Sequence, residues 1–280
     1  MTLIKSISGI RGTIGGPAGQ GLTPLDVVKY AAAYGTWVLN QPTASKLIVI
    51  GRDARLSGDM VSRLVAATLR GLGLDVLDLG LSTTPTVELV VPARQAAGGI
   101  ILTASHNPKQ WNALKLLNAL GEFISESDGQ QVLALADKEA FEFAPVTKLG
   151  RYSTDDTTLA AHIAAILALP LVDVEAIRAQ NFRVVVDAVN SSGGVAVPQL
   201  LAALGVETVE KLHCEPTGEF AHNPEPLPEN LRDIARVLAR GGFDLGIVVD
   251  PDVDRLALVS ENGEMFGEEY TLVAVADYVL

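Results

Sequence analysis

The chain has 280 residues, of which 48% are hydrophobic, which is enough for about two domains with buried cores and excludes fibrous and disordered proteins. Its net charge of −12 argues against nucleic acid or a membrane as the main partner, so an anionic substrate must be bound by local cations, backbone N–H groups or a metal ion. The single cysteine, Cys214, and the lack of a signal-peptide or membrane-span pattern predict a cytoplasmic protein.

Strand and helix patterns alternate over residues 1–150, which is typical of parallel α/β domains. Short buried strands are predicted for KLIVIG from Lys46, DVLDLG from Asp75 and GIILTA from Gly99. Helix starts are predicted where Thr23 precedes Pro24, where Thr84 precedes Pro85, and at Ser57, whose helix extends to Gly71. A further helix near Ser125 to Ala140 closes this first domain.

The periodicity weakens from Phe141 to about Thr157, a segment that contains Pro145 and Gly150 and is typical of a linker. The alternation then resumes, with strands predicted from Arg183, Val206 and Asp244 and helices predicted in GGVAVPQLLAALG and PENLRDIARVLARG. We therefore expect an α/β fold with two consecutive, mainly parallel domains that this linker joins.

The segment DLGIVVDPDVDR, residues 244–255, places three aspartates directly after a buried strand. Asp250, Asp252 and Asp254 alternate along the chain, so their carboxylates can point to one side of an extended or tightly turned loop. Three like charges at close range repel one another unless a cation lies among them, and an all-oxygen donor set suits Mg²⁺. Arg255 adds a planar guanidinium that suits a phosphate group.

Three other interpretations of this acidic segment are open. In an EF-hand, Glu261 would occupy the last ligand position, but Arg255 stands where that loop needs glycine. In a haloacid-dehalogenase-type phosphatase, Asp250 would be the nucleophile, but residues 256–280 contain no lysine of the kind that such an enzyme needs. The third interpretation is a solvated acidic turn without a ligand.

A second chemical segment is GGIILTASHNPKQWNALK, residues 98–115, which begins as an apolar strand and changes to small and polar residues at Thr103. Ligands of open α/β sheets bind at the carboxyl ends of strands, so Ser105 and His106 are candidates for chemistry. Asn107-Pro108 is equally typical of an ordinary turn. A serine hydrolase is disfavoured because the chain has no Gly-x-Ser-x-Gly elbow.

Three segments together resemble the N-terminal signatures of the α-D-phosphohexomutases, the phosphoglucomutase and phosphomannomutase family: SGIRG at 8–12, TASHNP at 103–108 and DPDVDR at 250–255. The resemblance covers the whole chain. It implies an α/β fold of two consecutive three-layer α/β/α domains with mainly parallel mixed sheets, plus the start of a third, with boundaries at 1–150, 151–260 and 261–280. It implies an isomerase that moves phosphate between the 1 and 6 positions of a hexose, glucose or mannose, through a phosphoserine and a bisphosphate. The implied cofactors are Mg²⁺ and an activator of the glucose 1,6-bisphosphate type, and the implied substrates are hexose phosphates.

The resemblance also implies a role for individual residues. Ser105 carries the phosphoryl group, and Lys115 is a general acid/base beside it. The residues implied to be catalytic are Ser105, His106, Lys115 and Arg11. The implied phosphate and substrate ligands are Arg11, Arg255 and Lys115. The implied metal ligands are Ser105, through its phosphate, Asp250, Asp252 and Asp254.

Other segments refine the resemblance. GEFAHNPEPLPENL, residues 218–231, is closer to the phosphoglucomutase/phosphomannomutase branch than to the phosphoglucosamine mutases. GRD at 51–53 resembles a family position, although Asp53 and Arg55 fit an ordinary ion pair equally well.

Members of the family have four domains, and the sequence stops at Leu280 inside an apolar pattern that resembles an unfinished helix. We therefore expect a truncated chain without the C-terminal domains of the same protein, and nearly inactive by itself. A non-catalytic scaffold that binds sugar phosphates is the alternative. The intact Ser105 and acidic loop favour the enzyme.

Overall fold

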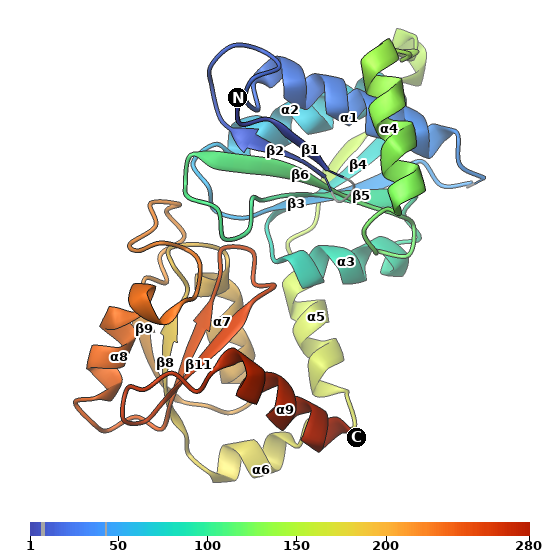
Figure 1. Ribbon diagram of the computed structural model, residues 1–280. Helices are drawn as coiled ribbons and strands as arrows, with labels where there is room; N and C mark the ends of the chain where they lie inside the picture. The colour runs from blue at the N-terminus through green and yellow to red at the C-terminus, as the bar shows by residue number, and fades with distance from the viewer. Residues whose placement is uncertain (7–8, 43) are drawn as a thin grey trace. The chain divides into compact units, whose positions relative to one another are not determined.

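The computed structural model describes residues 1–6, 9–42 and 44–280 (Figure 1). It divides the chain into two units, Met1–Thr158 and Leu159–Leu280. The sequence placed the first boundary at residue 150, but the first unit continues beyond it because Tyr152–Thr154 forms a strand, β7, that pairs with β4. Ser8, the first residue of the SGIRG segment, lies outside the described residues.

The first unit alternates strands and helices, as the sequence predicted. Its described strands are β1 (Ile4–Ser6), β2 (Gly9–Thr13), β3 (Leu47–Arg52), β4 (Asp75–Leu81), β5 (Gly98–Leu102), β6 (Trp111–Leu117) and β7 (Tyr152–Thr154). Its helices are α1 (Pro24–Leu39), α2 (Gly58–Gly71), α3 (Thr84–Ala93) and α4 (Glu126–Lys138), with a 3-10 turn, η1, at Val146–Lys148. The strands form one mixed sheet in the order β1-β2-β6-β5-β3-β4-β7.

Helices cover both faces of this sheet. Helices α1, α2 and α4 lie on one face and α3 lies on the other (Figure 1). Successive residues of a strand point to opposite faces, so Ile48 and Ile50 of β3 pack toward α1 and α2, while Val49 packs toward Val87 and Val91 of α3. Each of these fully buried side chains stabilises the fold by about 1.5–3 kcal/mol. Alternate side chains of one strand therefore contribute to the hydrophobic cores on both faces of the sheet.

Some helix starts agree with the predictions from the sequence, and others differ from them. Thr23 and Ser125 are N-caps with a capping box, and Pro24 begins α1 as predicted. The N-cap of α3 is Thr83 rather than Thr84, because the Thr83 hydroxyl accepts the backbone N–H of Thr86. Ser57 precedes α2 but makes no capping hydrogen bond in it; its hydroxyl accepts the side-chain amide of Asn112 instead.

The second unit has a smaller mixed sheet in the order β11-β10-β8-β9, in which only β11 is antiparallel among the described strands. The described strands are β8 (Arg183–Asp187), β9 (Thr208–Leu212), β10 (Leu245–Val249) and β11 (Leu256–Ser260). The helices are α5 (Thr158–Leu167), α6 (Val174–Ala179), α7 (Gly193–Ala203), α8 (Arg232–Leu238) and α9 (Glu268–Val279), with a 3-10 turn, η2, at Pro228–Asn230. The sequence did not predict α5 or α6.

This sheet is also covered on both faces. Val184 and Val186 of β8 pack toward α7, while Val185 packs toward Ile234 and Leu238 of α8. The three-layer α/β/α arrangement that the sequence predicted is confirmed in both units. None of the helices in the described part of the chain is long and apolar enough to cross a membrane.

The last helix, α9, is covered only in part. It packs in part against β11, and the Tyr278 hydroxyl donates to the Leu171 carbonyl oxygen over 2.8 Å. Large apolar side chains along it stay mostly in solvent, among them Leu272, which is 71% exposed. The apolar pattern that the sequence showed here is therefore a helix, as predicted.

Candidate active site

The TASHNP segment connects β5 to β6 and begins at the carboxyl end of β5, as predicted. Ser105 has a φ of +50°, in the left-handed region that residues other than glycine seldom adopt. Its backbone N–H donates to the hydroxyl oxygen of Thr103 over 2.9 Å. Thr103 is fully buried and Ser105 is half-buried. The loop therefore holds Ser105 in an uncommon backbone conformation at the end of a buried strand.

A hollow of about 210 Å³ lies beside this loop and is lined by residues of the loop, β2 and β6. Arg11 of β2 is paired with Ala113 of β6, and Lys115 of β6 is paired with Gly9 of β2. Because alternate residues of a strand share a face, Arg11 and Lys115 project from the same face of the sheet. Both line the hollow, together with Ser105 and His106.

The structure thus brings together the predicted site residues of the first unit: Ser105, His106, Arg11 and Lys115. Arg11 is exposed and Lys115 is half-buried, with its Nζ atom 5.9 Å from the centroid of the Phe123 ring. Two cations beside one hydroxyl form a local positive field in a chain of net charge −12. This hollow therefore suits an anionic ligand.

Gly9 is required by a close approach of two strands. Its φ is +147°, and a Cβ atom there would lie 2.3 Å from the carbonyl oxygen of Leu114 in β6. Gly12 of the same strand is also close to neighbouring backbone, because a Cβ atom there would lie 2.9 Å from the backbone nitrogen of Leu22. Gly9 therefore sets the β2–β6 spacing that carries Arg11 and Lys115.

We expect Gly9→Ala to destabilise the first unit by about 1–3 kcal/mol, because the added methyl group forces β2 away from β6. Denaturant unfolding of the 280-residue chain measures the change. Gly15→Ala is the matched control, since Gly15 also has a positive φ, +100°, but has no other atom within 4 Å of the added Cβ among the described residues. If both variants lose the same free energy of unfolding, the positive φ alone, and not the strand spacing, accounts for the need for glycine at position 9.

The acidic segment forms the turn between β10 and β11, two antiparallel strands. The Asp250 carboxylate atom Oδ1 accepts the backbone N–H groups of Asp254 and Arg255, each over 3.1 Å. Asp250 and Asp252 are buried, whereas Asp254 is exposed. The turn therefore places two carboxylates inside the unit and the third at its surface.

Two serines that the sequence did not single out hold this turn in place. The hydroxyls of Ser191 and Ser192 both donate to the carbonyl oxygen of Pro251, over 2.7 and 2.9 Å. Both serines are buried and lie between β8 and α7, at the carboxyl end of β8. In the sequence, the only signal for this role was the pair of adjacent serines directly after a predicted strand.

The acidic turn has the donor set of a metal site. One carboxylate oxygen from each of Asp250, Asp252 and Asp254 lies within 4.8 Å of the other two. Three carboxylate oxygens at this spacing suit a hard divalent cation such as Mg²⁺, and the cation offsets their mutual repulsion. The strand β11 follows the turn directly, so the segment lacks the helix that would complete an EF-hand.

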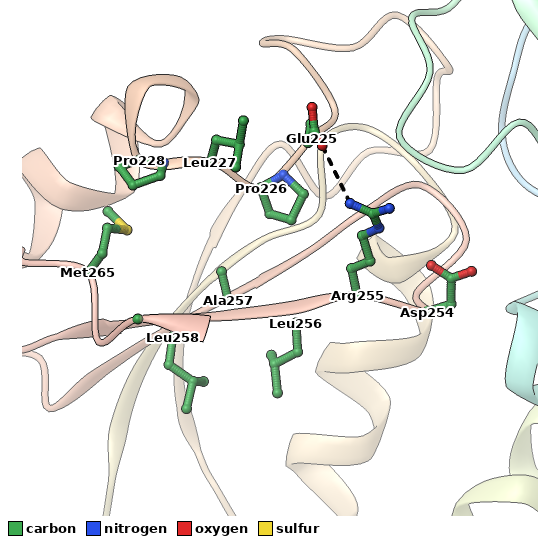
Figure 2. A pocket seen from close by; sticks show the side chains of 11 residues that line it. Glu225, Pro226, Leu227, Pro228, Asp254, Arg255, Leu256, Ala257, Leu258 and Met265 are labelled. Atoms are coloured by element: carbon green, nitrogen blue, oxygen red, sulfur yellow. Dashed lines mark hydrogen bonds and ion pairs between the residues drawn. The ribbon is translucent and has the colours of Figure 1, made fainter. Parts of the chain in front are cut away.

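Arg255 lines a separate pocket of about 460 Å³ in the second unit (Figure 2). The pocket lies between the segment Glu225–Pro228 and the residues from Asp254 to Leu258. Figure 2 shows the Arg255 side chain extending toward Glu225, with Arg255 Nη1 3.5 Å from Glu225 Oε1. Arg255 is 43% exposed, so this ion pair is weak and leaves the guanidinium accessible to an anion.

A histidine and a buried aspartate form a further polar cluster in the second unit, which the sequence did not predict. His222 Nε2 lies 3.2 Å from each carboxylate oxygen of Asp187, and Nδ1 lies 2.7 Å from the carbonyl oxygen of Asn223. Burial lowers the pKa of His222, but its hydrogen bonds to Asp187 and the charge of that carboxylate outweigh burial and raise the pKa above 6.5. The cluster ties the segment of residues 218–231 to the end of β8.

This cluster predicts a pH dependence of stability. Because the pKa of His222 is higher in the folded chain than when unfolded, its contribution is complete below about pH 6.5 and is lost as the pH rises through the raised pKa. His222→Gln should cost about 1–3 kcal/mol at pH 6 and much less at pH 9, measured by denaturant unfolding.

His162→Gln is the comparison variant for this prediction. Burial lowers the pKa of His162, so its contribution to the free energy of unfolding is lost as the pH falls, in the opposite direction to that of His222. A cost of His222→Gln that does not change with pH would contradict the charged His222–Asp187 pair.

Polar side chains gather at the carboxyl ends of strands in both α/β/α units, as in α/β proteins that bind ligands there. The family description "Phosphoglucomutase/phosphomannomutase, alpha/beta/alpha domain I" matches residues 3–143, and that of domain II matches residues 160–263. The chain belongs to the phosphoglucomutase/phosphomannomutase family, the α-D-phosphohexomutases.

Individual relatives agree with this assignment. A phosphoglucomutase/phosphomannomutase of Thermococcus kodakarensis is 36% identical over 96% of the chain and 59% of its own length. A phosphoglucosamine/phosphogalactosamine mutase of Sulfurisphaera tokodaii is 30% identical over 92% of the chain and 54% of its own length. A crystal structure of a phosphoglucomutase/phosphomannomutase family protein from Burkholderia thailandensis, 27% identical, superimposes with a TM-score of 0.83 over 99% of the chain and 60% of its own length. The chain thus spans little more than half of these proteins.

Proposed function

We propose that the chain acts in the interconversion of hexose 1-phosphates and hexose 6-phosphates through a phosphoserine and a bisphosphate. The observation that carries this proposal is the hollow beside β5, where Ser105 lies with Arg11, His106 and Lys115. A phosphoryl group in transfer spreads negative charge over its oxygens, so catalysis depends mainly on positioned cations. Such cations line this hollow.

Ser105 Oγ is the atom to which the phosphoryl group is attached in this proposal. A hydroxyl of the sugar phosphate attacks the phosphorus of phosphoserine, the bond from phosphorus to Ser105 Oγ breaks, and a hexose bisphosphate forms. The proton of the sugar hydroxyl passes to Ser105 Oγ, with Lys115 Nζ as its carrier. The other phosphoryl group of the bisphosphate returns to Ser105 by the reverse step, which leaves the hexose with phosphate at the other position.

The acidic turn and its neighbours supply the charge balance. Asp250, Asp252 and Asp254 are the proposed protein ligands of Mg²⁺, an ion whose positive charge would stabilise phosphoryl oxygens. Arg255 offers a planar guanidinium to the substrate phosphate. Its pairing with Glu225 is weak, so an anion can compete for the guanidinium.

Glucose and mannose phosphates are the proposed substrates. The relatives named above include both a phosphoglucomutase/phosphomannomutase and an amino-sugar mutase, and the first has the higher identity, 36% against 30%. The segment of residues 218–231 supports the same branch, and His222 within it is tied to Asp187. We propose that the reaction takes place in the cytoplasm.

A second candidate is a non-catalytic scaffold that binds sugar phosphates. Arg11 and Lys115 at the hollow are compatible with it, because they bind an anion whether or not it reacts. A phosphatase that uses Asp250 as nucleophile is a weaker candidate, since Asp250 Oδ1 already accepts two backbone N–H groups. Both alternatives predict an unmodified Ser105.

Incubation of the 280-residue chain with glucose 1,6-bisphosphate and Mg²⁺ tests the proposal. We expect intact-mass analysis to show a fraction with one phosphoryl group, and peptide mass spectrometry to place that group on Ser105. A phosphoryl group on Asp250 would favour the phosphatase. A chain that binds the bisphosphate and gains no phosphoryl group would favour the scaffold.

A further inference from the structure

Arg55 is a fully buried arginine close to the serine loop. It follows β3 and is 1% exposed. Arginine is seldom buried to this extent, because removal of a guanidinium from water is unfavourable unless its donors are all hydrogen-bonded and its charge is paired. The partners of Arg55 therefore show what its burial achieves.

All five N–H donors of the Arg55 guanidinium have acceptors. Nε donates to Asp53 Oδ2 over 2.9 Å, which is the ion pair that the sequence suggested. The other four donors reach backbone carbonyl oxygens between Ser105 and Trp111, in the loop and at the start of β6: Nη1 donates to Pro108 (2.8 Å) and Trp111 (3.1 Å), and Nη2 donates to Asn107 (2.8 Å) and Ser105. An ordinary ion pair needs only the first of these bonds. The remaining four bonds link Arg55 to the loop that carries Ser105.

Asp53 is linked to the same serine from its other side through Thr103. Its Oδ2 atom accepts the Thr103 hydroxyl over 2.7 Å, and the Thr103 hydroxyl oxygen accepts the backbone N–H of Ser105 over 2.9 Å. Asp53 and Thr103 are both fully buried. The Asp53–Arg55 pair therefore holds the N–H of Ser105 through Thr103 and holds its carbonyl oxygen directly.

We propose that Arg55, together with Asp53, is a positioning residue for the nucleophile: it fixes Ser105 in its left-handed conformation and thereby directs its hydroxyl into the hollow. The inference rests on the proposed phosphoryl transfer at Ser105. A φ of +50° is unfavourable for serine and persists only where the surroundings impose it. Hydrogen bonds on both sides of the residue, from buried and charged groups, impose it here.

The proposal predicts that lysine cannot replace Arg55. Lysine keeps the positive charge beside Asp53, but its compact ammonium cannot reach four carbonyl oxygens that a planar guanidinium spans. Arg55→Lys therefore separates charge pairing from loop positioning. In this variant we expect the ion pair to remain and the loop to lose its constraint.

Hydrogen exchange of the 280-residue chain measures the positioning without any substrate. In Arg55→Lys we expect the backbone amides of residues 104–111 to exchange about tenfold faster or more, while those of β3 and α2 exchange as in the unmodified chain. Phosphoryl uptake by Ser105 from glucose 1,6-bisphosphate should fall by on the order of 10²-fold, because a misplaced nucleophile loses its alignment.

Substitutions of Thr103 are a second, more conservative test, which still tests the positioning role if Arg55→Lys does not fold. Thr103→Val removes the hydroxyl at nearly constant shape and should accelerate exchange at Ser105 and slow its phosphoryl uptake. Thr103→Ser keeps the hydroxyl and should restore both. If Thr103 acted through packing alone, Thr103→Ser would have the larger effect and Thr103→Val the smaller, since valine preserves the side-chain volume better than serine.

Arg63→Lys is the matched control, because Arg63 is exposed on α2 and its guanidinium pairs with Asp59 over 2.9 Å. It should leave both measurements unchanged. Unchanged exchange of residues 104–111 in both Arg55→Lys and Thr103→Val would overturn the positioning role. Failure of the unmodified chain to take up phosphate counts against the proposed function instead, and the exchange data then decide the inference by themselves.

Discussion

Ser105→Ala is expected to abolish phosphoryl labelling of the chain by glucose 1,6-bisphosphate and to lower phosphoryl exchange by on the order of 10³-fold or more. The physical reason is that Ser105 Oγ is the proposed attachment atom of the phosphoryl group, and the substitution removes this atom. Intact-mass analysis before and after exposure to the bisphosphate measures the labelling. The melting temperature should change little, because Ser105 is only half-buried.

Ser127→Ala is the control for this result, since Ser127 is exposed in the first turn of α4. It should retain full labelling. Labelling that persists in Ser105→Ala, on any other residue, would contradict the assignment of Ser105 as the phosphoryl carrier.

Mg²⁺ is expected to stabilise the second unit, and Asp252→Asn is expected to remove most of that effect. A ligand that binds only the folded state stabilises by about 2.7 kcal/mol at a hundred times its dissociation constant. For a chain of this size each kcal/mol raises the melting temperature by about 2–4 °C. Thermal melts of the unmodified chain with and without millimolar Mg²⁺ should therefore differ by several degrees.

Without Mg²⁺, Asp252→Asn should be as stable as the unmodified chain or more so, because it removes one of three carboxylates whose oxygens lie within 4.8 Å. Asp156→Asn is the matched control, because Asp156 is exposed and lies outside the acidic turn. It should keep the full response to Mg²⁺. A melting temperature that is indifferent to Mg²⁺ in the unmodified chain would contradict the metal site.

The elements that the sequence predicted well are those whose signals are local. The strands β3, β4 and β5 are short apolar segments bounded by polar residues or glycine, and the caps at Thr23 and Ser125 have an acidic residue three positions later. The end of β5 also located Ser105, and the end of β10 located the acidic turn, because side chains that follow a buried strand must emerge at the sheet edge.

The parts that the sequence missed depend on contacts between distant segments. Arg55 contacts backbone carbonyl oxygens more than 50 residues away, and a backbone carbonyl has no signature in the sequence. His222 pairs with Asp187 across 35 residues, and Ser191 contacts Pro251 across 60. The start of α3 differed for another reason: two adjacent threonines, Thr83 and Thr84, could each have capped it, and only the backbone geometry selects between them.

The most direct test of the account is a single-turnover transfer from the phosphorylated chain to a sugar. The chain is loaded on Ser105 with a radiolabelled phosphoryl group, freed of bisphosphate, and mixed with unlabelled glucose 1-phosphate or mannose 1-phosphate and Mg²⁺. A single turnover detects slow transfer as well as fast transfer. We expect the label to leave Ser105 and to appear in a hexose bisphosphate. Label that stays on the chain, or leaves it only as inorganic phosphate, would contradict it.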